Sequence, residues 1–453
     1  METLARGEYS GGIVERLRAA ELSKNVCLME MIRRAVISTG SVEGISVIES
    51  AIEVLVAAQV GQPGIVAALL ASPNFGYWAY ECLTRLRGVV TDVDGRIQPM
   101  SLSTDLGHLA NFAAVAALRA AVPCSLELSM RDGVVSLPTL GHAVVSPWED
   151  AHHAHFTSDG DSVIIRFGAW QLGLSITDGL DVIGTSSDWT AVPRMTVRSQ
   201  GLNLSVLLDD ADPFLSQLAP SPLALSSELI IKQWESRLTE AWQLLTRHNR
   251  LVAIGLAEGL TTLVPSSEVE PGRPITATCG WAWGAIILSL PSNGRSCAEA
   301  LTHEFHHLAL AAAEDVAPLF DGTHDDLCYA PWRDDPRPRS TLLQGAYAFM
   351  GVTGLWLHQL HVGSPAERDI AAVEFARRRE NIAEVLDELG DGAGFTHTGR
   401  LFVAQMANSV DEWLAEPVPQ PAETTARQLN AEHRQRWLRT YGSKSSAMVP
   451  GPR

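Results

Sequence analysis

The spacing of the hydrophobic residues changes twice along this chain, and this limits the folds that it can adopt. From about Gly11 to Ala121, apolar residues recur at intervals of three and four, as in VIESAIEVLVAAQVG, which predicts α-helices. From about Cys124 to Leu215 they form short alternating or β-branched runs between turn sequences, such as SLELSM, DSVIIRFG, RMTVRS and NLSVLL, which predicts strands. Helical spacing returns from about Pro222. We therefore expect an α+β protein with a β-rich middle between two helical parts.

The same changes divide the chain into four predicted regions. Residues 1–121 form a helical N-terminal region, residues 122–221 a β-rich region, and residues 222–414 a mostly helical region. Residues 415–453 form a Pro-rich linker, one amphipathic helix and a tail. We assign the apolar runs RLVAIGLAEGLTTLVP and GWAWGAIILSLP to the helices of the third region.

Composition and charge exclude several classes of function. A chain of 453 residues with 46% hydrophobic residues is typical of a soluble globular protein. Its formal net charge of -18 argues against binding to nucleic acid, because nothing could neutralise a row of phosphates. The cysteines show no paired spacing, and the N-terminus has no signal-peptide pattern, so we expect a reducing, cytoplasmic location. The most apolar stretch is interrupted by Arg119, so we expect no membrane association.

One segment carries a metal-binding motif, SCAEALTHEFHHLAL. His303, Glu304 and His307 have the spacing H-E-x-x-H, with His306 between them. Ser296 and Glu299 form an S-x-x-E capping box, which predicts a zincin-like motif helix that starts at Ser296. Residues four apart share a helix face, so both imidazoles can reach one metal ion.

The motif alone leaves the metal chemistry open. The extended zinc-peptidase form requires Gly and His where this chain has Leu310 and Ala313, so that form is excluded. A thermolysin-like site would take a glutamate from a later helix, and the candidates are Glu367, Glu374 and Glu380.

A cationic segment follows the motif helix, in the sequence CYAPWRDDPRPRSTLLQGAYAF. Its arginines, Arg333, Arg337 and Arg339, would suit a dicarboxylate co-substrate, because a guanidinium group binds a carboxylate through two parallel hydrogen bonds. Alternatively, these arginines pair with Asp334 and Asp335 in a structural loop.

Three segments together resemble a known family. They are the motif segment extended upstream to PITATCGWAWGAIILSLP, the segment YAPWRDDPRPRSTLLQGAYAF, and FTHTGRLFVAQM. The chain resembles, over residues 234–406, the bacterial HExxH-motif proteins that modify ribosomally made peptides. These are described as iron(II)- and 2-oxoglutarate-dependent peptide β-hydroxylases.

The resemblance implies roles for particular residues. His303 and His307 would hold iron(II), and Gln344, at a position that is His or Gln in the family, ranks first as third ligand. Glu304 would orient a ligand or water. Arg337 is the first choice to bind the far carboxylate of 2-oxoglutarate, followed by Arg333 and Arg339. Glu304 itself, Glu374 and His358 remain open as alternative third ligands.

Two other functions remain possible. In a zinc peptidase of the H-E-x-x-H type, Glu304 would activate a metal-bound water. In a non-catalytic peptide-binding protein, the metal site would be vestigial. A second group of histidines, His152, His153 and His155, is interpreted as part of a solvated loop. Tyr347 and Phe349 are interpreted as core residues that could instead line a substrate pocket.

Overall fold

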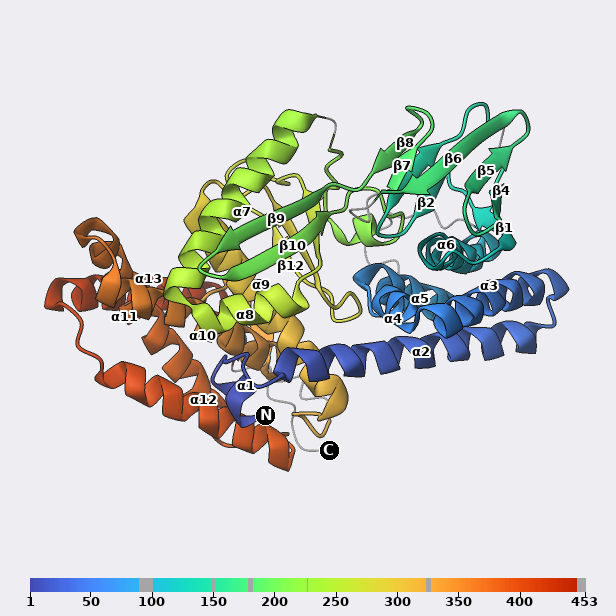
Figure 1. The fold of residues 1–453 in the computed structure, drawn as a ribbon. Coiled ribbons are helices and arrows are strands. Elements are labelled where there is room, and N and C mark those ends of the chain that lie inside the picture. The colour runs from blue at the N-terminus through green and yellow to red at the C-terminus, as the bar shows by residue number, and fades with distance from the viewer. Residues whose placement is uncertain (89–100, 149–150, 178–181, 226, 323–326, 446–453) are drawn as a thin grey trace.

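A computed structural model describes residues 1–453 except 89–100, 149–150, 178–181, 226, 323–326 and 446–453. The predicted α+β class is confirmed: helices come first, strands fill the middle of the chain between residues 124 and 289, and helices α9 to α13 follow (Figure 1).

The N-terminal helices begin at capping residues that the sequence supplies. Ser41, Ser72 and Ser101 each accept a hydrogen bond from a backbone N–H in the first turn of the helix that follows. The apolar stretch with Arg119 forms α6, which is buried along almost its whole length. The helices are α1 (Glu2–Ala5), α2 (Ile13–Thr39), α3 (Val42–Gly61), α4 (Pro63–Leu70), α5 (Pro73–Leu86) and α6 (Leu102–Ala120).

Helix α3 is the part of the described chain that is long and apolar enough to cross a membrane, by length and composition only. The window Gly44–Gly61 has a mean hydropathy of 1.5, and 28% of it is buried inside the protein. Helix α3 packs against α6. Its residues Val56 and Val60 are exposed.

An antiparallel sheet packs on α6 and follows it in the chain. Its strand order is β1-β4-β5-β6-β7, and a smaller sheet has the order β2-β3-β8. His153 and His155 lie on β4 with their side chains on its more exposed face, so their assignment to a loop was wrong; alternation with buried Ala154 and Phe156 places them in the strand. The strands are β1 (Cys124–Ser129), β2 (Val134–Leu137), β3 (Gly141–Val144), β4 (His153–Ser158), β5 (Val163–Phe167), β6 (Trp170–Ile176), β7 (Val182–Gly184) and β8 (Trp189–Ala191).

A second five-stranded sheet has the order β12-β13-β11-β10-β9 and lies beside the motif helix. Its strands are β9 (Arg194–Ser199), β10 (Leu202–Leu208), β11 (Thr262–Ser266), β12 (Thr276–Ala277) and β13 (Ala285–Ser289). Strands β11 and β13 come from the two apolar runs that were assigned to helices, and that assignment was wrong for them. Every residue of both strands is buried, and parallel strands buried on both faces lack the alternation that identifies a strand.

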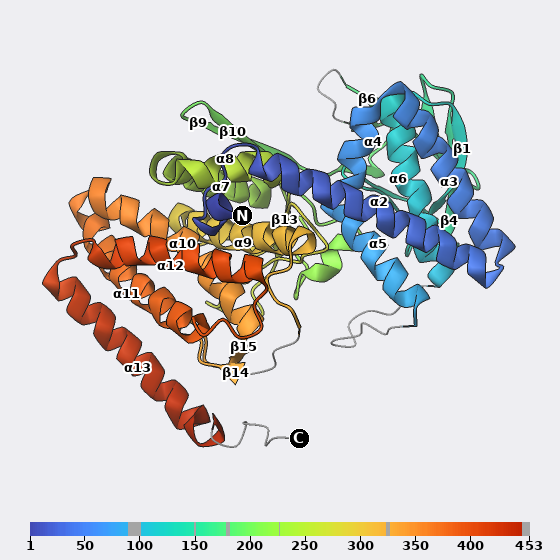
Figure 2. The same ribbon diagram turned by 90° about the horizontal axis from the view of Figure 1, so that it is seen from below.

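Helices connect these strands and form the C-terminal part. The short 3₁₀ helix η1 (Leu215–Leu218), then α7 (Glu228–His248) and α8 (Arg250–Gly259), lie between β10 and β11. The later elements are α9 (Gly294–Val316), β14 (Leu327–Cys328), β15 (Arg337–Pro338), α10 (Arg339–Val362), α11 (Pro365–Leu389), α12 (His397–Ala415) and α13 (Gln420–Ser445). Helix α13 begins inside the segment predicted as a Pro-rich linker and packs on α11 (Figure 2).

The hydrophobic residues form two large cores, joined by α2. One lies among the N-terminal helices and the first sheets; the other surrounds α9 and includes Trp234 and Trp242. Leu4, Tyr9 and Val14 belong to the core around α9, and α2 then runs across to the other lobe (Figure 2). The region limits at 121, 221 and 414 remain predictions. The first residues of the chain nonetheless pack against its C-terminal half.

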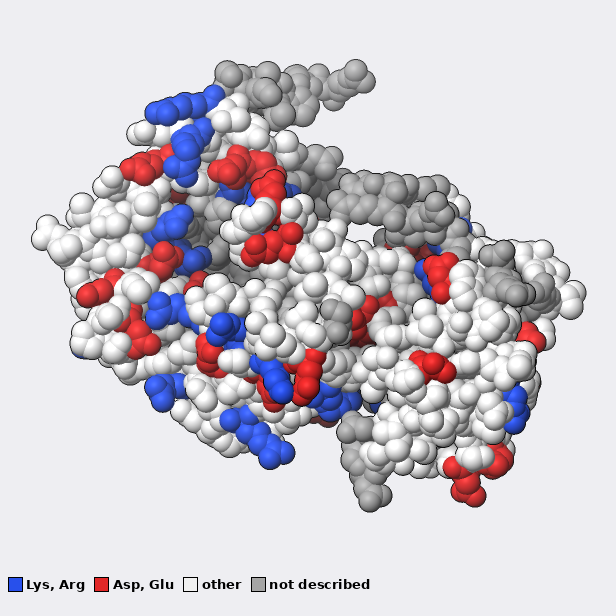
Figure 3. Space-filling view, turned by 90° about the horizontal axis from the view of Figure 1, so that it is seen from above, with Lys and Arg blue, Asp and Glu red and all other residues white. Residues whose placement is uncertain are grey.

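The surface differs between the two halves on the face drawn in Figure 3. Acidic and basic side chains are interspersed over the half that carries the C-terminal helices, and most of the described surface of the other half is uncharged.

Candidate metal centre

The motif helix α9 begins two residues earlier than predicted, at Gly294. Asn293 is its N-cap: its side chain accepts a hydrogen bond from the Ser296 backbone N–H (3.0 Å), and the Ser296 hydroxyl accepts one from the Asn293 N–H (3.2 Å). Ser296 therefore closes the capping box from its third position, and the prediction that it starts the helix was wrong. Asn is as good an N-cap as Ser, so the sequence allowed the helix to begin after either Asn293 or Ser296.

His303 and His307 lie one turn apart, and their Nε2 atoms are 3.2 Å from each other. Two nitrogens that each lie about 2.0–2.1 Å from one ion, at angles of about 90–109°, are roughly 2.8–3.4 Å apart. Burial lowers the pKa of both imidazoles, so both stay uncharged at neutral pH, as metal ligands must be. The pair therefore fits a single metal ion.

Gln344, on α10, contacts the other side of the His307 ring. Its Oε1 lies 3.4 Å from His307 Nδ1, and its Nε2 donates a 2.5 Å hydrogen bond to Glu314 Oε2. With Nδ1–H as donor, His307 keeps an Nε2 lone pair for a metal. In this arrangement Gln344 orients a ligand, as outer partners of metal-bound histidines do. It would have to leave Nδ1 to become a ligand itself, and its assignment as third ligand remains a prediction.

Glu304 is buried in the wall of the same site. Burial raises the pKa of its carboxyl to about 7, while side-chain hydrogen bonds with Thr276 and Thr278 act in the opposite direction. Thr276 belongs to the edge strand β12 of the second sheet. This edge strand therefore lies beside the motif helix, with Thr276 close to the Glu304 carboxyl.

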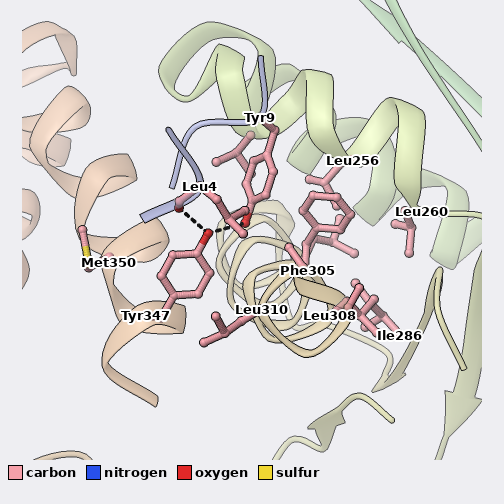
Figure 4. Close-up of a cluster of buried hydrophobic side chains, with 14 of the residues drawn as sticks. Leu4, Tyr9, Leu256, Leu260, Ile286, Phe305, Leu308, Leu310, Tyr347 and Met350 are labelled. Carbon is pink, nitrogen blue, oxygen red and sulfur yellow. Dashed lines mark hydrogen bonds between the residues drawn. The ribbon is translucent and has the colours of Figure 1, made fainter. Parts of the chain in front are cut away.

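His306 points into the core and takes no part in the site. It is fully buried, its Nδ1 lies 2.8 Å from the Thr302 carbonyl oxygen, and the Tyr9 ring packs edge-on against it. Gly351 makes room for it, because a Cβ there would lie 2.2 Å from the imidazole. Figure 4 shows the neighbouring core, in which the Tyr347 hydroxyl donates to the Leu4 carbonyl.

An open cleft of about 660 Å³ lies over the two histidines, a size typical of small-molecule and cofactor sites. Its wall includes both imidazoles, Glu304, Thr276 of β12, Thr278 just after this strand, Gln344 and Arg333. Phe349 packs edge-on against His303, with ring centroids 4.7 Å apart, whereas Tyr347 is in the core. Of the two aromatics, Phe349 therefore contacts the site.

The three arginines occupy different environments. Arg333 lines the cleft, and its Nε donates to Asp335 (2.8 Å). Arg337 pairs with the same carboxylate (2.8 Å), and buried Arg339 pairs with Asp391. The pairing of Arg333 and Arg337 with Asp335 agrees with the structural interpretation of the loop. Of the three, Arg333 alone is among the described residues that line the cleft.

The alternative ligands on the later helices are not among the described residues that line the cleft. Glu367 closes the capping box of α11, Glu374 pairs with Arg378 (3.1 Å), and Glu380 pairs with Arg427 (3.3 Å). His358 packs against His248, with ring centroids 5.2 Å apart. Within the described parts of the chain, no group of three or more His, Cys, Asp or Glu side chains could hold a metal.

Three residues of the site were missed at the sequence level: Thr276, Thr278 and Glu314. Thr276 belongs to a two-residue strand, which is too short to produce a pattern, and Thr278 follows directly after it. Glu314 lies two turns beyond His307 on α9, and this spacing was the only available signal.

The chain matches no protein-family model, and no curated protein matches it.

Proposed function

We propose that this protein hydroxylates a side-chain carbon, at the β position, in a ribosomally made peptide, with iron(II) and 2-oxoglutarate. The observation that carries the proposal is the pair of uncharged imidazoles with Nε2 atoms 3.2 Å apart, open to a cleft with an arginine in its wall. Two histidines and further open positions are what non-haem iron(II) oxygenases use. The resemblance described above favours the same chemistry.

The reaction balances without any other reductant. Dioxygen gives one oxygen atom to the substrate C–H bond and the other to 2-oxoglutarate, which leaves as succinate and carbon dioxide. Iron(II), held by His303 and His307, would supply the activation of dioxygen.

The chain's own residues position the reactants. Gln344 fixes the His307 ring through Nδ1, and Arg333 is the best placed of the three predicted arginines to bind a carboxylate in the cleft. Glu304, hydrogen-bonded with Thr276 and Thr278, is proposed to orient a ligand or water, because hydroxylation needs no general base that deprotonates water.

A zinc peptidase is the second candidate, and the position of Glu304 favours it. This carboxyl lines the cleft next to both histidines, where it could activate a metal-bound water. The candidate lacks support for its third ligand, since Glu367, Glu374 and Glu380 do not line the cleft. The third candidate, a peptide-binding protein with a vestigial site, predicts that no divalent metal binds.

The test is anaerobic reconstitution with iron(II), followed by 2-oxoglutarate. We expect a weak visible charge-transfer band that is absent from His303→Ala. Tight zinc binding without such a band, and peptide cleavage that Glu304→Gln abolishes, would favour the peptidase. Loss of iron binding in Glu304→Gln would identify Glu304 as a ligand instead.

A further inference from the structure

A second, smaller cavity is lined by Phe349, the aromatic residue that contacts the metal site. It measures about 180 Å³ and is lined by Trp332, Phe349, Arg377, Arg378, Asn381 and Ile382. We call it the Arg377 cavity. It is smaller than the roughly 300–1,000 Å³ of pockets for whole drug-sized ligands, so its size suits one chemical group with a short stem.

The cavity is one aromatic ring away from a predicted metal ligand. Phe349 contacts both His303 and Trp332, with ring centroids 4.7 and 4.9 Å apart respectively. Trp332 packs tightly over Gly345, where a Cβ would lie 2.7 Å from the indole. Because Gly345 follows Gln344 on α10, one turn of this helix supports both sites.

Two polar side chains in the cavity have no partner among the residues that the structure describes. Asn381 is 6% exposed, and its amide makes no hydrogen bond to a described residue. Arg377 has no described carboxylate within 4 Å of its guanidinium group, and its Nε is buried without a partner. A buried donor such as the Arg377 Nε is rare and costly unless a ligand or water satisfies it.

The second arginine of the cavity is already balanced by protein carboxylates. Arg378 pairs with Glu374 at 3.1 Å and Glu299 at 3.6 Å, and its guanidinium lies over the Phe349 ring. Arg377 therefore contributes about one unbalanced positive charge. This charge suits a single carboxylate better than a doubly charged phosphate. The aromatic rings and Ile382 would surround an aliphatic stem.

We propose that the Arg377 cavity is a carboxylate subsite, in which Arg377 and Asn381 bind a carboxylate on a short aliphatic chain. Two ligands carry this chemistry: the far end of 2-oxoglutarate and an acidic side chain of the peptide. The choice between them rests on the proposed function, whereas carboxylate binding itself requires no iron.

The first test uses the full chain without metal and titrates it with glutarate by calorimetry. We expect Arg377→Ala and Asn381→Ala to weaken binding about tenfold or more, because a hydrogen bond to a charged group is lost. Arg368→Ala, an exposed arginine on the same helix, is the matched control and keeps wild-type affinity. Arg377→Lys, which keeps the charge but loses the planar fork, replaces Arg377→Ala if that variant does not fold. Absent binding, or equal affinity in wild type and the Arg377 variants, overturns the proposal.

The second test identifies the carboxylate. If 2-oxoglutarate occupies the cavity, Arg377→Ala weakens it in the charge-transfer titration but leaves 2-oxobutyrate, which lacks the far carboxylate, unchanged. If the peptide occupies the cavity, each keto acid binds to Arg377→Ala with the same affinity as to wild type. N-acetyl-glutamate methylamide then binds only to wild type. Glutarate binding that depends on Arg377, without any charge-transfer band, keeps the subsite and rejects the oxygenase. A charge-transfer band, combined with glutarate binding that does not depend on Arg377, supports the oxygenase and rejects the subsite.

Discussion

The two faces of α9 use the same residue type for opposite purposes. His303 and His307 face an open cleft with their Nε2 atoms together, whereas His306, one residue before His307, is enclosed by core side chains and by the close approach of Gly351. Each histidine sits on a mostly apolar helix and next to another histidine in the sequence or one turn away. The surroundings supplied by other elements, more than the local sequence, therefore decide whether a histidine can bind a ligand.

The cleft face of α9 is tested by the metal affinity of His303→Ala, for which we expect the greatest change. His303→Ala removes one of the two imidazoles, so we expect iron(II) and zinc affinity to fall by about a thousandfold or more, with little change in thermal stability of the metal-free protein. Equilibrium dialysis and a melting curve measure the two quantities. Undiminished metal binding would show that the motif is not the metal site.

The core face is tested by Gly351→Ala. The new methyl group would meet the His306 ring, and we expect a loss of about 3 kcal/mol in the free energy of unfolding. Gly354→Ala on the same helix is the control, since its nearest neighbour would be 4.0 Å away; higher helix propensity should leave it equal to wild type or up to about 1 kcal/mol more stable. Chemical denaturation provides both values, and equal effects at the two glycines would contradict tight packing around His306.

His108, a buried histidine in the other core, should make stability depend on pH. Burial, with a smaller contribution from the positive charge of Arg131, lowers the pKa of His108 to about 3, against about 6.5 in an unfolded chain. Its contribution to stability is therefore complete above pH 6.5 and decreases as the pH falls towards 3, because only the unfolded state takes up the proton.

As the pH falls from 7 to 5, we expect protonation of His108 in the unfolded state to lower the free energy of unfolding of the wild type by about 2 kcal/mol. His108→Leu should not show this loss. Urea denaturation of both proteins at the two pH values isolates this difference. Parallel pH dependences would mean that His108 is not buried in its neutral form.

The smallest expected effect concerns the orientation of the cleft histidines. Gln344→Ala removes the partner of His307 Nδ1, and we expect a loss of metal affinity of about tenfold, with the charge-transfer band retained at saturating iron. Gln344→Glu is the comparison, because its carboxylate can still accept from Nδ1–H and should restore most of the affinity. A loss as large as that of His303→Ala would instead make Gln344 a direct ligand.

Sequence patterns predicted the elements whose buried face shows in the spacing of residues within a single helix or strand. The helical and alternating runs gave α2, α3, β1, β5, β9 and β10 correctly, because amphipathic elements show their buried face in the sequence. The fully buried strands β11 and β13 were missed, since burial on both faces leaves no period to detect. The start of α9 was misplaced because Asn293 and Ser296 are both good capping residues.

The site shows the same division between local and distant information. The H-E-x-x-H spacing was enough to predict that His303 and His307 share a helix face, and the structure brings their Nε2 atoms together. No pattern indicated that Thr276 would lie beside Glu304 or that Gln344 would contact Glu314. These contacts depend on how strands and loops pack, which the spacing within one element does not encode.

The spacing of apolar residues was sufficient to predict the α+β class. The H-E-x-x-H spacing was sufficient to predict a helix with two histidines on one face, because a helical repeat of 3.6 residues places positions four apart on the same face whatever surrounds them. Only the packing of distant segments shows that His306 belongs to the core, that Gln344 contacts His307 Nδ1, and that Arg377 lines a cavity together with Phe349. These contacts join segments tens to hundreds of residues apart, so their geometry is fixed only when the helices and the sheet pack around a common core.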